Sequence, residues 1–209
     1  MDRVPVSETV DAGSIPAGST MDKKYVSRAG EKLEAALEHF KINTKDLVCL
    51  DVGCSTGGFT DCLLQKEASK IFAMDTGYGV LDWKLRNNPQ VVVMERTNLL
   101  YIESFPELLD LAVVDTSWTR LKLSVPAASR FVKPNGIILA LIKPQYEAPK
   151  SYLKRGVLIP EKLDEVVEGV RTQLTELGFV VSSSFLSPVI GSGGNREYWV
   201  KLGLVGEVA

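Results

Sequence analysis

The sequence predicts a doubly wound α/β fold with a mostly parallel, seven-stranded sheet and an antiparallel edge strand. Short apolar runs alternate along the chain with amphipathic helices or loops, an order typical of parallel strands covered on both faces. Near the C-terminus two apolar segments follow one another without a helix between them, which favours antiparallel pairing at one edge.

Three helices and seven strands are expected. The helices are residues 31–40, about 58–66 and about 161–177. Apolar side chains recur at i, i+3, i+4 and i+7 in the first, and the stripe of the last ends at Gly178, which can stop a helix. The strands are short, apolar runs, as is typical of buried strands. In chain order they are residues 47–52, 70–74, 90–94, 111–114, 136–142, 179–185 and 197–202.

The chain is expected to form a single domain at residues 23–209, preceded by a tail at residues 1–22. The tail contains two prolines, two glycines and several serines and threonines, and it shows neither a helical nor a strand period. Such a segment buries too little apolar surface to fold, so we expect it to be disordered. Met21 is a possible translation start, which would make the preceding residues foreign to the natural protein.

The composition excludes several classes of protein. With 45% hydrophobic and 24% charged residues, the 209-residue chain has the balance of a globular domain. Its longest apolar run, residues 136–142, is far shorter than the ~20 residues of a membrane-spanning helix, so we expect no membrane partner. A single histidine, His39, cannot supply a two-histidine metal site. Three cysteines without a Cys-x-x-Cys pair, and no secretory leader, favour a reducing cytoplasm over a disulfide framework.

Charge is unevenly distributed along the chain. The net charge of −2 by itself argues against a polyanionic partner. Residues 119–155, however, hold eight cations and one acid, Glu147, so this segment carries +7 and is able to face a polyanion. The alternative is that these cations lie on a loop and a helix and contact only solvent, which would give the same charge without a polyanionic partner. The eight cations are Arg120, Lys122, Arg130, Lys133, Lys143, Lys150, Lys154 and Arg155.

The turn at residues 51–58 (DVGCSTGG) follows the first predicted strand and opens the next helix. Glycines there let the backbone approach a ligand, and the helix N-terminus offers free N–H groups to negative charge. A serine hydrolase with a G-x-S-x-G elbow needs a histidine after the serine, but His39 precedes Ser55. A dinucleotide site of the G-x-G-x-x-G type needs glycine where Ser55 stands. A tight turn that binds nothing is the structural alternative.

A site for S-adenosylmethionine fits this turn best. Such sites combine an acid at the end of the first strand, a glycine turn beneath the methionine part, and a carboxylate after the second strand that accepts the ribose hydroxyls. Asp51 and Asp75 stand at the two acidic positions, 24 residues apart. Thr97 and Asn98 follow the third strand, where a polar side chain is expected to face the adenine. A helix-capping role for Asp75 is the alternative.

A candidate catalytic group stands at the end of the fifth predicted strand. Asp115 ends the fourth strand and Lys143 ends the fifth, and in an open parallel sheet the carboxyl ends of the strands border one crevice. A lysine directly after the apolar run 136–142 is either neutralised by a carboxylate or placed for chemistry. A purely structural ion pair between Lys143 and Asp115 remains the alternative to catalysis.

Several segments together resemble the TlyA (hemolysin A-type) branch of the FtsJ-like RNA ribose 2′-O-methyltransferases. They are residues 25–33 (YVSRAGEKL), 50–60 (LDVGCSTGGFT), 93–98 (VMERTN) and 142–145 (IKPQ), and the similarity extends over roughly residues 24–202. The resemblance implies a Rossmann-like, S-adenosylmethionine-dependent methyltransferase fold, a ribosomal RNA substrate and a catalytic Lys-Asp-Lys-Glu tetrad. On matching positions the tetrad is Lys32, Asp115, Lys143 and Glu197, the last within residues 194–198 (GNREY).

The resemblance also implies the chemistry of each site residue. A ribose 2′-hydroxyl is a poor nucleophile, so a base must take its proton while the methyl sulfonium lies in line. Free lysine has a pKa of about 10.4, and lowering it by ~3 units costs roughly 4 kcal/mol, which burial and a second cation can supply. We assign Lys143 as the base, Lys32 as the second cation that orients the 2′-oxygen, and Asp115 and Glu197 as positioning carboxylates.

The cofactor implied is S-adenosylmethionine, and no metal is expected. The residues assigned to its site are Asp51, Gly53, Ser55, Thr56, Gly57, Gly58, Phe59, Asp75, Thr97, Asn98 and Asp115.

The chain departs from the family pattern in three places. Family members usually carry an N-terminal S4-type RNA-binding domain, where this sequence shows only the tail. Residues 115–120 are DTSWTR where the family has DVSFIS, and Ala29 replaces a glycine.

A hemolysin, or a module that binds RNA or cofactor without catalysis, is the rival function. A pore-forming helix is not evident, and the intact tetrad positions argue against loss of catalysis.

Overall fold

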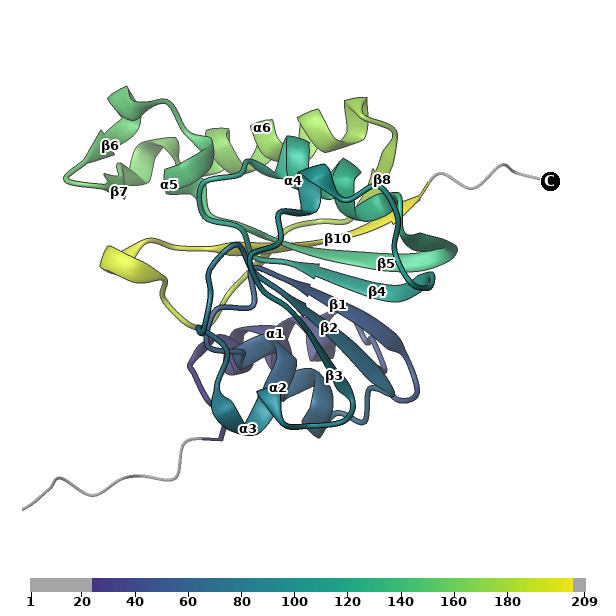
Figure 1. Ribbon diagram of the computed structural model, residues 1–209. Helices are drawn as coiled ribbons and strands as arrows, with labels where there is room; N and C mark the ends of the chain where they lie inside the picture. Colours follow the sequence, from purple (N-terminus) through teal and green to yellow (C-terminus); the bar gives the residue numbers. More distant parts are fainter. Residues whose placement is uncertain (1–23, 205–209) are drawn as a thin grey trace, which may run out of the picture.

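The computed structural model describes residues 24–204 of the chain. The tail expected at residues 1–22 lies outside the described residues, as do residue 23 and residues 205–209. Helices cover both faces of a central sheet, which confirms the predicted α/β class (Figure 1).

Eight strands of the described chain form the central sheet. They are β1 (Val48–Val52), β2 (Lys70–Met74), β3 (Val91–Met94), β4 (Leu109–Val114), β5 (Val132–Ile142), β8 (Phe179–Val181), β9 (Phe185–Leu186) and β10 (Tyr198–Leu204). The order is β3-β2-β1-β4-β5-β10-β8, and β9 pairs with β10 outside this path. Strands β1 to β5 pair in parallel, whereas β10 runs antiparallel to β5, β8 and β9. The predicted mostly parallel sheet with an antiparallel edge is therefore confirmed.

One predicted strand, residues 179–185, is divided into β8 and β9. The residue after β8, Ser182, accepts the N–H of Lys201 on its hydroxyl (3.0 Å), and the same hydroxyl donates to the carbonyl oxygen of Ser183 (2.9 Å). Serine side chains that bond to nearby backbone compete with the regular ladder, which explains the interruption.

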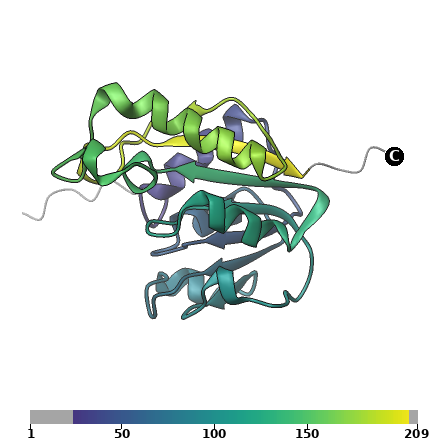
Figure 2. The same cartoon turned by 90° about the horizontal axis from the view of Figure 1, so that it is seen from above.

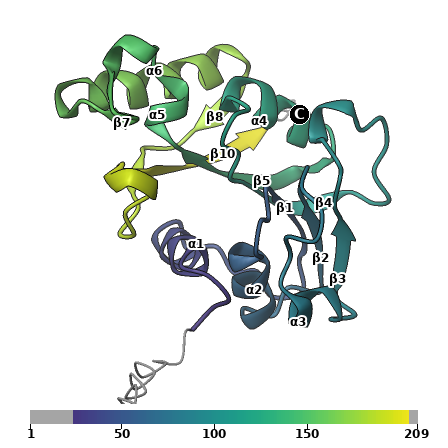
Figure 3. The ribbon, with the colours of Figure 1, turned by 60° about the vertical axis from the view of Figure 1, so that its left-hand side comes forward.

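The helices form two layers, one on each face of the sheet (Figures 1 and 3). The helices α1 (Ala29–His39), α2 (Gly58–Gln65) and α3 (Trp83–Arg86) lie on one face, and α4 (Leu121–Ser129), α5 (Pro144–Glu147) and α6 (Leu163–Glu176) on the other. Figure 2 shows α6 running alongside β10. Strand side chains alternate accordingly, since Cys49 belongs to the core cluster that contains Leu33 of α1, whereas its neighbour Leu50 belongs to the cluster that contains Val125 of α4.

Several elements have no clear sequence signal. Helix α4 contains Pro126 in its interior, and α3 and α5 have four residues each, too few to show a helical period. A small hairpin, β6 (Leu153–Lys154) and β7 (Val157–Leu158), is also unpredicted. Short 3-10 helices complete the chain: η1 (Leu99–Tyr101), η2 (Lys150–Tyr152), η3 (Pro160–Lys162) and η4 (Ser192–Gly194). Between residues 24 and 204, no helix has the length and apolar character needed to cross a membrane.

The strand register places four residues in one row at the carboxyl edge of the sheet. Val52 pairs with both Met74 and Val114, and Met74 pairs with Met94, so these strand ends are level. The residues that follow them, three of them acidic, therefore stand side by side just beyond the sheet. They are Gly53, Asp75, Glu95 and Asp115.

Candidate active site

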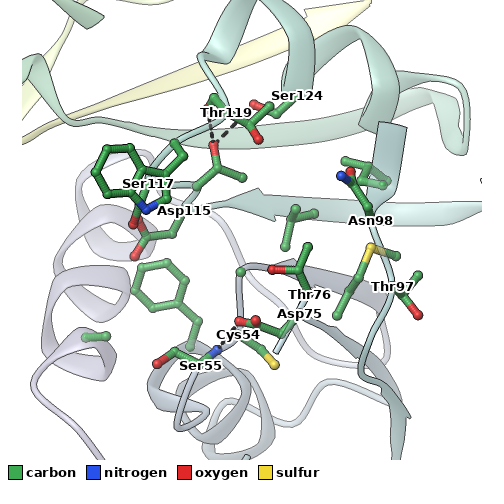
Figure 4. A pocket seen from close by; sticks show the side chains of 18 of the residues that line it. Cys54, Ser55, Asp75, Thr76, Thr97, Asn98, Asp115, Ser117, Thr119 and Ser124 are labelled. Carbon is green, nitrogen blue, oxygen red and sulfur yellow. Dashed lines mark hydrogen bonds between the residues drawn. The ribbon is translucent and has the colours of Figure 1, made fainter. Parts of the chain in front are cut away.

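A pocket of about 470 Å³ opens at this carboxyl edge (Figure 4). It is bounded by the turn after β1, the segments after β2 and β3, the loop after β4 and the end of β5. Figure 4 shows Thr97 and Asn98 on one side of the pocket and Asp115 and Ser117 on the other. Nine residues predicted from the sequence line it: Gly53, Ser55, Thr56, Phe59, Asp75, Thr97, Asn98, Asp115 and Lys143.

The turn after β1 requires glycine at its first position. Gly53 has a φ of +83°, and a Cβ atom there would lie 2.4 Å from the carbonyl oxygen of Asp115. The N–H of Ser55 donates a hydrogen bond to Oδ2 of Asp75 (2.9 Å). The backbone after β1 is therefore held between the loop after β4 and the carboxylate after β2, and it forms part of the pocket wall.

Gly57 and Gly58, at the start of α2, do not line the pocket. A Cβ atom at Gly57 would lie 2.3 Å from Leu85 Cδ1, and one at Gly58 would lie 2.2 Å from Ser27 Oγ. Both glycines therefore permit close packing around the start of α2, which supports the turn.

Asp51 does not line the pocket either, because it is fully buried. Its Oδ2 accepts hydrogen bonds from the N–H (2.9 Å) and the hydroxyl (2.7 Å) of Thr60. Burial raises the pKa of Asp51 to about 7. Asp51 therefore fixes α2 to the end of β1, beneath the residues that border the pocket.

The polar side chains expected near the adenosine part are held in fixed orientations. Asp75 accepts the N–H of Gly77 on Oδ1 (2.7 Å), in addition to its bond from the turn. The hydroxyl of Thr97 donates to a backbone carbonyl (3.0 Å). Oδ1 of Asn98 accepts the N–H of Leu100 (3.0 Å) and so caps η1. These bonds hold the carboxylate of Asp75 and the amide of Asn98 at the pocket, with little freedom to rotate.

Glu95, to which the sequence patterns assign no role, organises the loop after β2. Its carboxylate accepts the N–H groups of Gly79 (2.9 Å), Val80 (3.0 Å) and Leu81 (3.3 Å), and it pairs with Arg86 (2.5 Å). The backbone hydrogen bonds, together with the guanidinium, lower the pKa of Glu95 to about 2. The signal in the sequence is its position, since it directly follows β3 as the two predicted acids follow β2 and β4.

We expect Glu95→Gln to reduce the dependence of stability on acid pH. The pKa of this carboxyl is about 2 in the folded protein and ordinarily 4.5, so its charge stabilises the fold above about pH 4.5. This contribution is lost as the pH falls towards 2. The free energy of unfolding of the variant, from chemical denaturation, should be lower at neutral pH and should vary less between about pH 5 and 3.

The matched control for this prediction is Glu103→Gln, which changes an exposed glutamate outside the loop. It should leave the pH dependence unchanged. If the free energy of unfolding changed equally with pH in wild type and in Glu95→Gln between about pH 5 and 3, Glu95 would not stabilise the loop as described.

The four residues of the implied tetrad form two ion pairs. Lys143 pairs with Asp115 at the wall of the pocket. Lys32 of α1 pairs with Glu197, with 2.6 Å between Nζ and Oε2. The second pair does not line the pocket, but the antiparallel register of β10 with β5, continued by one residue, sets Glu197 opposite Lys143. All four side chains are at most 14% exposed, so both pairs are well shielded from water.

The basic segment 119–155 does not form one continuous surface. Lys133 pairs with Asp110 (2.6 Å) at the other end of β5, and Lys143 belongs to the tetrad. Arg130 donates to the carbonyl oxygen of Leu99 (3.2 Å). The positive charges that are close together in the sequence are therefore separated in space. Lys133 lies near the start of β5 and Lys143 directly follows its end, so the two lysines are at opposite edges of the sheet.

A different set of eight cations is exposed and forms no ion pair with another described residue, and we call these the edge cations. Five of them are within two residues of one that lines the pocket or belongs to the tetrad, whereas Lys150, Lys154 and Arg155 follow Lys143 by 7 to 12 residues. The other described cations without an ion pair are Arg130, Lys41 and Lys201, of which the two lysines line a second cavity away from the edge. The edge cations are Arg28, Arg96, Arg120, Lys122, Lys150, Lys154, Arg155 and Arg196.

Two aromatic side chains accompany the edge cations. Trp118 lines the pocket and is 89% exposed, and its ring centroid lies 5.4 Å from that of Tyr146. Tyr146 is in α5, and its N–H donates to the carbonyl oxygen of Lys143 (2.9 Å). The exposed Trp118 and the half-buried Tyr146 therefore form an aromatic pair next to the Lys143–Asp115 pair.

Comparisons with known proteins agree with this geometry. A family model described as FtsJ-like methyltransferase matches residues 25–204. "Putative rRNA methyltransferase YqxC" of Bacillus subtilis is 38% identical over 192 residues, covering 88% of this chain and 67% of that protein. The "16S/23S rRNA (cytidine-2′-O)-methyltransferase TlyA" of Mycobacterium tuberculosis is 37% identical over 202 residues, covering 95% and 75%. A solved structure named "Putative hemolysin" from Streptococcus thermophilus superposes with a TM-score of 0.84 at 35% identity, covering 90% of this chain and 70% of that one.

Proposed function

The chain belongs to the FtsJ-like methyltransferase family, and on this premise we propose that it methylates a ribose 2′-hydroxyl of ribosomal RNA with S-adenosylmethionine as the donor. The observation that carries the proposal is the composition of a single pocket. One side has a glycine turn and the Asp75 carboxylate, and the other has the Lys143–Asp115 pair. The names of two relatives, both rRNA methyltransferases, support the choice of substrate.

The pocket residues fit S-adenosylmethionine. The volume of about 470 Å³ is within the ~300–1,000 Å³ typical of small-molecule sites. Gly53 lets the turn after β1 approach the loop after β4, because a Cβ atom there would collide with the carbonyl oxygen of Asp115, and the carboxylate of Asp75 offers an acceptor to hydroxyl groups of the ligand. We assign Asp75 to the ribose hydroxyls, and Thr97 and Asn98 to the adenine. When bound, this cofactor supplies a methyl group on a positively charged sulfur.

Lys143 is the residue placed to accept the proton of the ribose hydroxyl. An amine accepts a proton only after its own ammonium proton has left, so the proton held in the Lys143–Asp115 ion pair must first pass to solvent; the Asp115 carboxylate then stabilises the ammonium that forms when the hydroxyl proton is taken up. Lys32, which Glu197 holds at 2.6 Å, is assigned to donate a hydrogen bond to the hydroxyl oxygen. The proton thus leaves the hydroxyl at Lys143 Nζ while the oxygen is oriented for in-line attack.

The surface around the pocket suits RNA. The edge cations are exposed and form no ion pair within residues 24–204, so they are available to phosphates. Trp118 offers a broad ring at the pocket mouth, and bases commonly stack on such rings in RNA complexes.

We expect Trp118→Ala to raise the KM for RNA by roughly 10- to 100-fold, because stacking of a base on an aromatic ring contributes ~1–3 kcal/mol. The affinity for S-adenosylmethionine should change little. Steady-state methyl transfer with varied RNA, together with calorimetric titration of the cofactor, measures both. Trp118→Phe should restore most of the loss. Trp83→Ala is the control, since Trp83 is 76% exposed but does not line the pocket, and an equal effect of both substitutions would refute the assignment.

The proposed function is tested by transfer of labelled methyl groups from S-adenosylmethionine to purified bacterial ribosomal subunits and to naked ribosomal RNA. Nuclease digestion and mass spectrometry then locate the methyl group. A label on a ribose 2′-oxygen is expected. A label on a base, or no transfer to either substrate, would contradict the proposal.

A further inference from the structure

The segment from α5 to the end of β7 forms a small lobe that projects from the body of the molecule, at the upper left of Figure 1. We call residues 144–159 the hairpin lobe; it begins directly after Lys143 and contains β6 and β7. It has an apolar cluster of its own, distinct from the two main cores. The buried members of that cluster are Ala148, Leu158 and Val166, the last from α6.

The tip of the hairpin lobe presents cations on a stiff turn. The register pairs Lys154 with Val157, so Arg155 and Gly156 form a two-residue connection. Both have positive φ, +53° and +81°, as a tight type I′ hairpin turn requires. The side chains of Lys154 and Arg155 are exposed and form no ion pair with another described residue. A pair of exposed cations on a tight turn suits the phosphates of a nucleic acid.

Asn195 fastens the hairpin lobe to the loop before β10. Its side-chain oxygen accepts the N–H of Leu158 (3.1 Å), and its side-chain nitrogen donates to the carbonyl oxygen of Gly156 (3.2 Å). The residue is only 5% exposed. Its own carbonyl oxygen accepts the N–H of Gly191 (2.9 Å), which closes the loop.

The same loop encloses the carboxylate of Glu197. A Cβ atom at Gly191 would lie 2.1 Å from Glu197 Oε1, so the loop backbone packs directly against this side chain. Glu197 is 3% exposed and holds Lys32. The hairpin lobe is therefore joined to the tetrad twice, by the chain at Lys143 and by the hydrogen bonds of Asn195 near Glu197.

We propose that the hairpin lobe is an RNA-binding arm and that Asn195 is the positioning residue that fixes this arm relative to the tetrad. Lys154 and Arg155 bind phosphates of the RNA, and the connection through Asn195 sets where the bound strand lies relative to Lys143. This inference rests on the proposed function for the identity of the polyanion.

Filter binding of full-length protein to purified bacterial ribosomal RNA tests the arm, and it does not depend on turnover. Lys154→Ala/Arg155→Ala should weaken binding by about tenfold and should reduce the slope of log affinity against log salt by about 1.5, since each phosphate contact contributes about 0.7–0.9. Lys41→Ala/Lys45→Ala removes two exposed lysines that lie elsewhere in the chain and should change neither quantity. Unchanged affinity and slope in the arm variant would overturn the proposal.

A double-mutant cycle tests the role of Asn195. Asn195→Ala should lower kcat for RNA methylation while leaving cofactor affinity unchanged. In this background, the two arm substitutions should lower kcat by less than a further threefold. Asn195→Asp keeps the acceptor for Leu158 and should retain part of the activity. Additive effects would show that Asn195 does not position the arm. Normal RNA binding by a wild-type protein that transfers no methyl group would contradict the proposed function and leave the arm supported.

Discussion

Lys143→Ala is expected to lower the rate of methyl transfer by about 10²- to 10⁴-fold, the usual contribution of a positioned general base. The affinity for S-adenosylmethionine should stay nearly unchanged, because the assignment gives the lysine a role in proton removal and none in holding the donor. Single-turnover transfer to RNA measures the rate, and calorimetric titration measures the affinity. Retention of normal turnover by this variant would remove Lys143 from the mechanism.

Strand β5 supplies a matched control for this experiment. Lys133 lies near its start and pairs with Asp110 at the start of β4 (2.6 Å), just as Lys143 follows its end and pairs with Asp115 after β4. Lys133→Ala therefore breaks an equivalent lysine–aspartate pair at the opposite edge of the sheet. It should leave methyl transfer within about twofold of wild type, because exposed pairs contribute only ~0–1 kcal/mol to stability. Equal losses in the two variants would point to a general structural effect.

Gly53→Ala is expected to produce the second large effect, a loss of cofactor affinity of at least about tenfold together with reduced stability. Positive φ at an alanine costs more than about 1 kcal/mol. The new methyl group would also lie 2.4 Å from the carbonyl oxygen of Asp115, and relief of such a contact typically costs ~1–3 kcal/mol. Because both segments border the pocket, their separation should distort it. Chemical denaturation and calorimetric titration of S-adenosylmethionine measure the two losses.

Gly178→Ala separates the backbone strain from the collision. Gly178 has a similar φ of +88°, but a Cβ atom there has no neighbour within 4 Å, and the residue follows α6 away from the pocket. This variant should lose about 1 kcal/mol of stability and no cofactor affinity. If Gly53→Ala bound the cofactor as tightly as Gly178→Ala does, the turn after β1 would not be the cradle of the donor.

The sheet could be predicted from the sequence because its strands are short apolar runs covered on both faces. For β2 the predicted and observed bounds coincide at Lys70–Met74. Helix α4 was not predicted because Pro126 interrupts its pattern, and packing on β5 and η1 is its main support. The hairpin lobe depends on the side chain of Asn195, which is 37 residues from Leu158 in sequence, and no local pattern carries that information.

The site was predictable where position along a parallel sheet determines it. Asp75, Asp115 and Lys143 follow strands directly, so the topology alone brings them to one edge. Lys32 and Glu197 are 165 residues apart, and only the resemblance to the family identified them; the family itself is confirmed by the match over residues 25–204. Position alone does not identify the role of Asp51, because this next-to-last residue of β1 is fully buried and does not line the pocket.

A crystal structure of the protein with bound S-adenosylmethionine would show whether the methyl donor and the catalytic lysine share one pocket. The sulfur is expected over the Gly53 turn, the ribose hydroxyls on Asp75, and the methyl group directed towards Lys143 with room for one oxygen atom about 3 Å away. A cofactor bound elsewhere, or a methyl group directed away from Lys143, would contradict the claim that donor and base share this pocket.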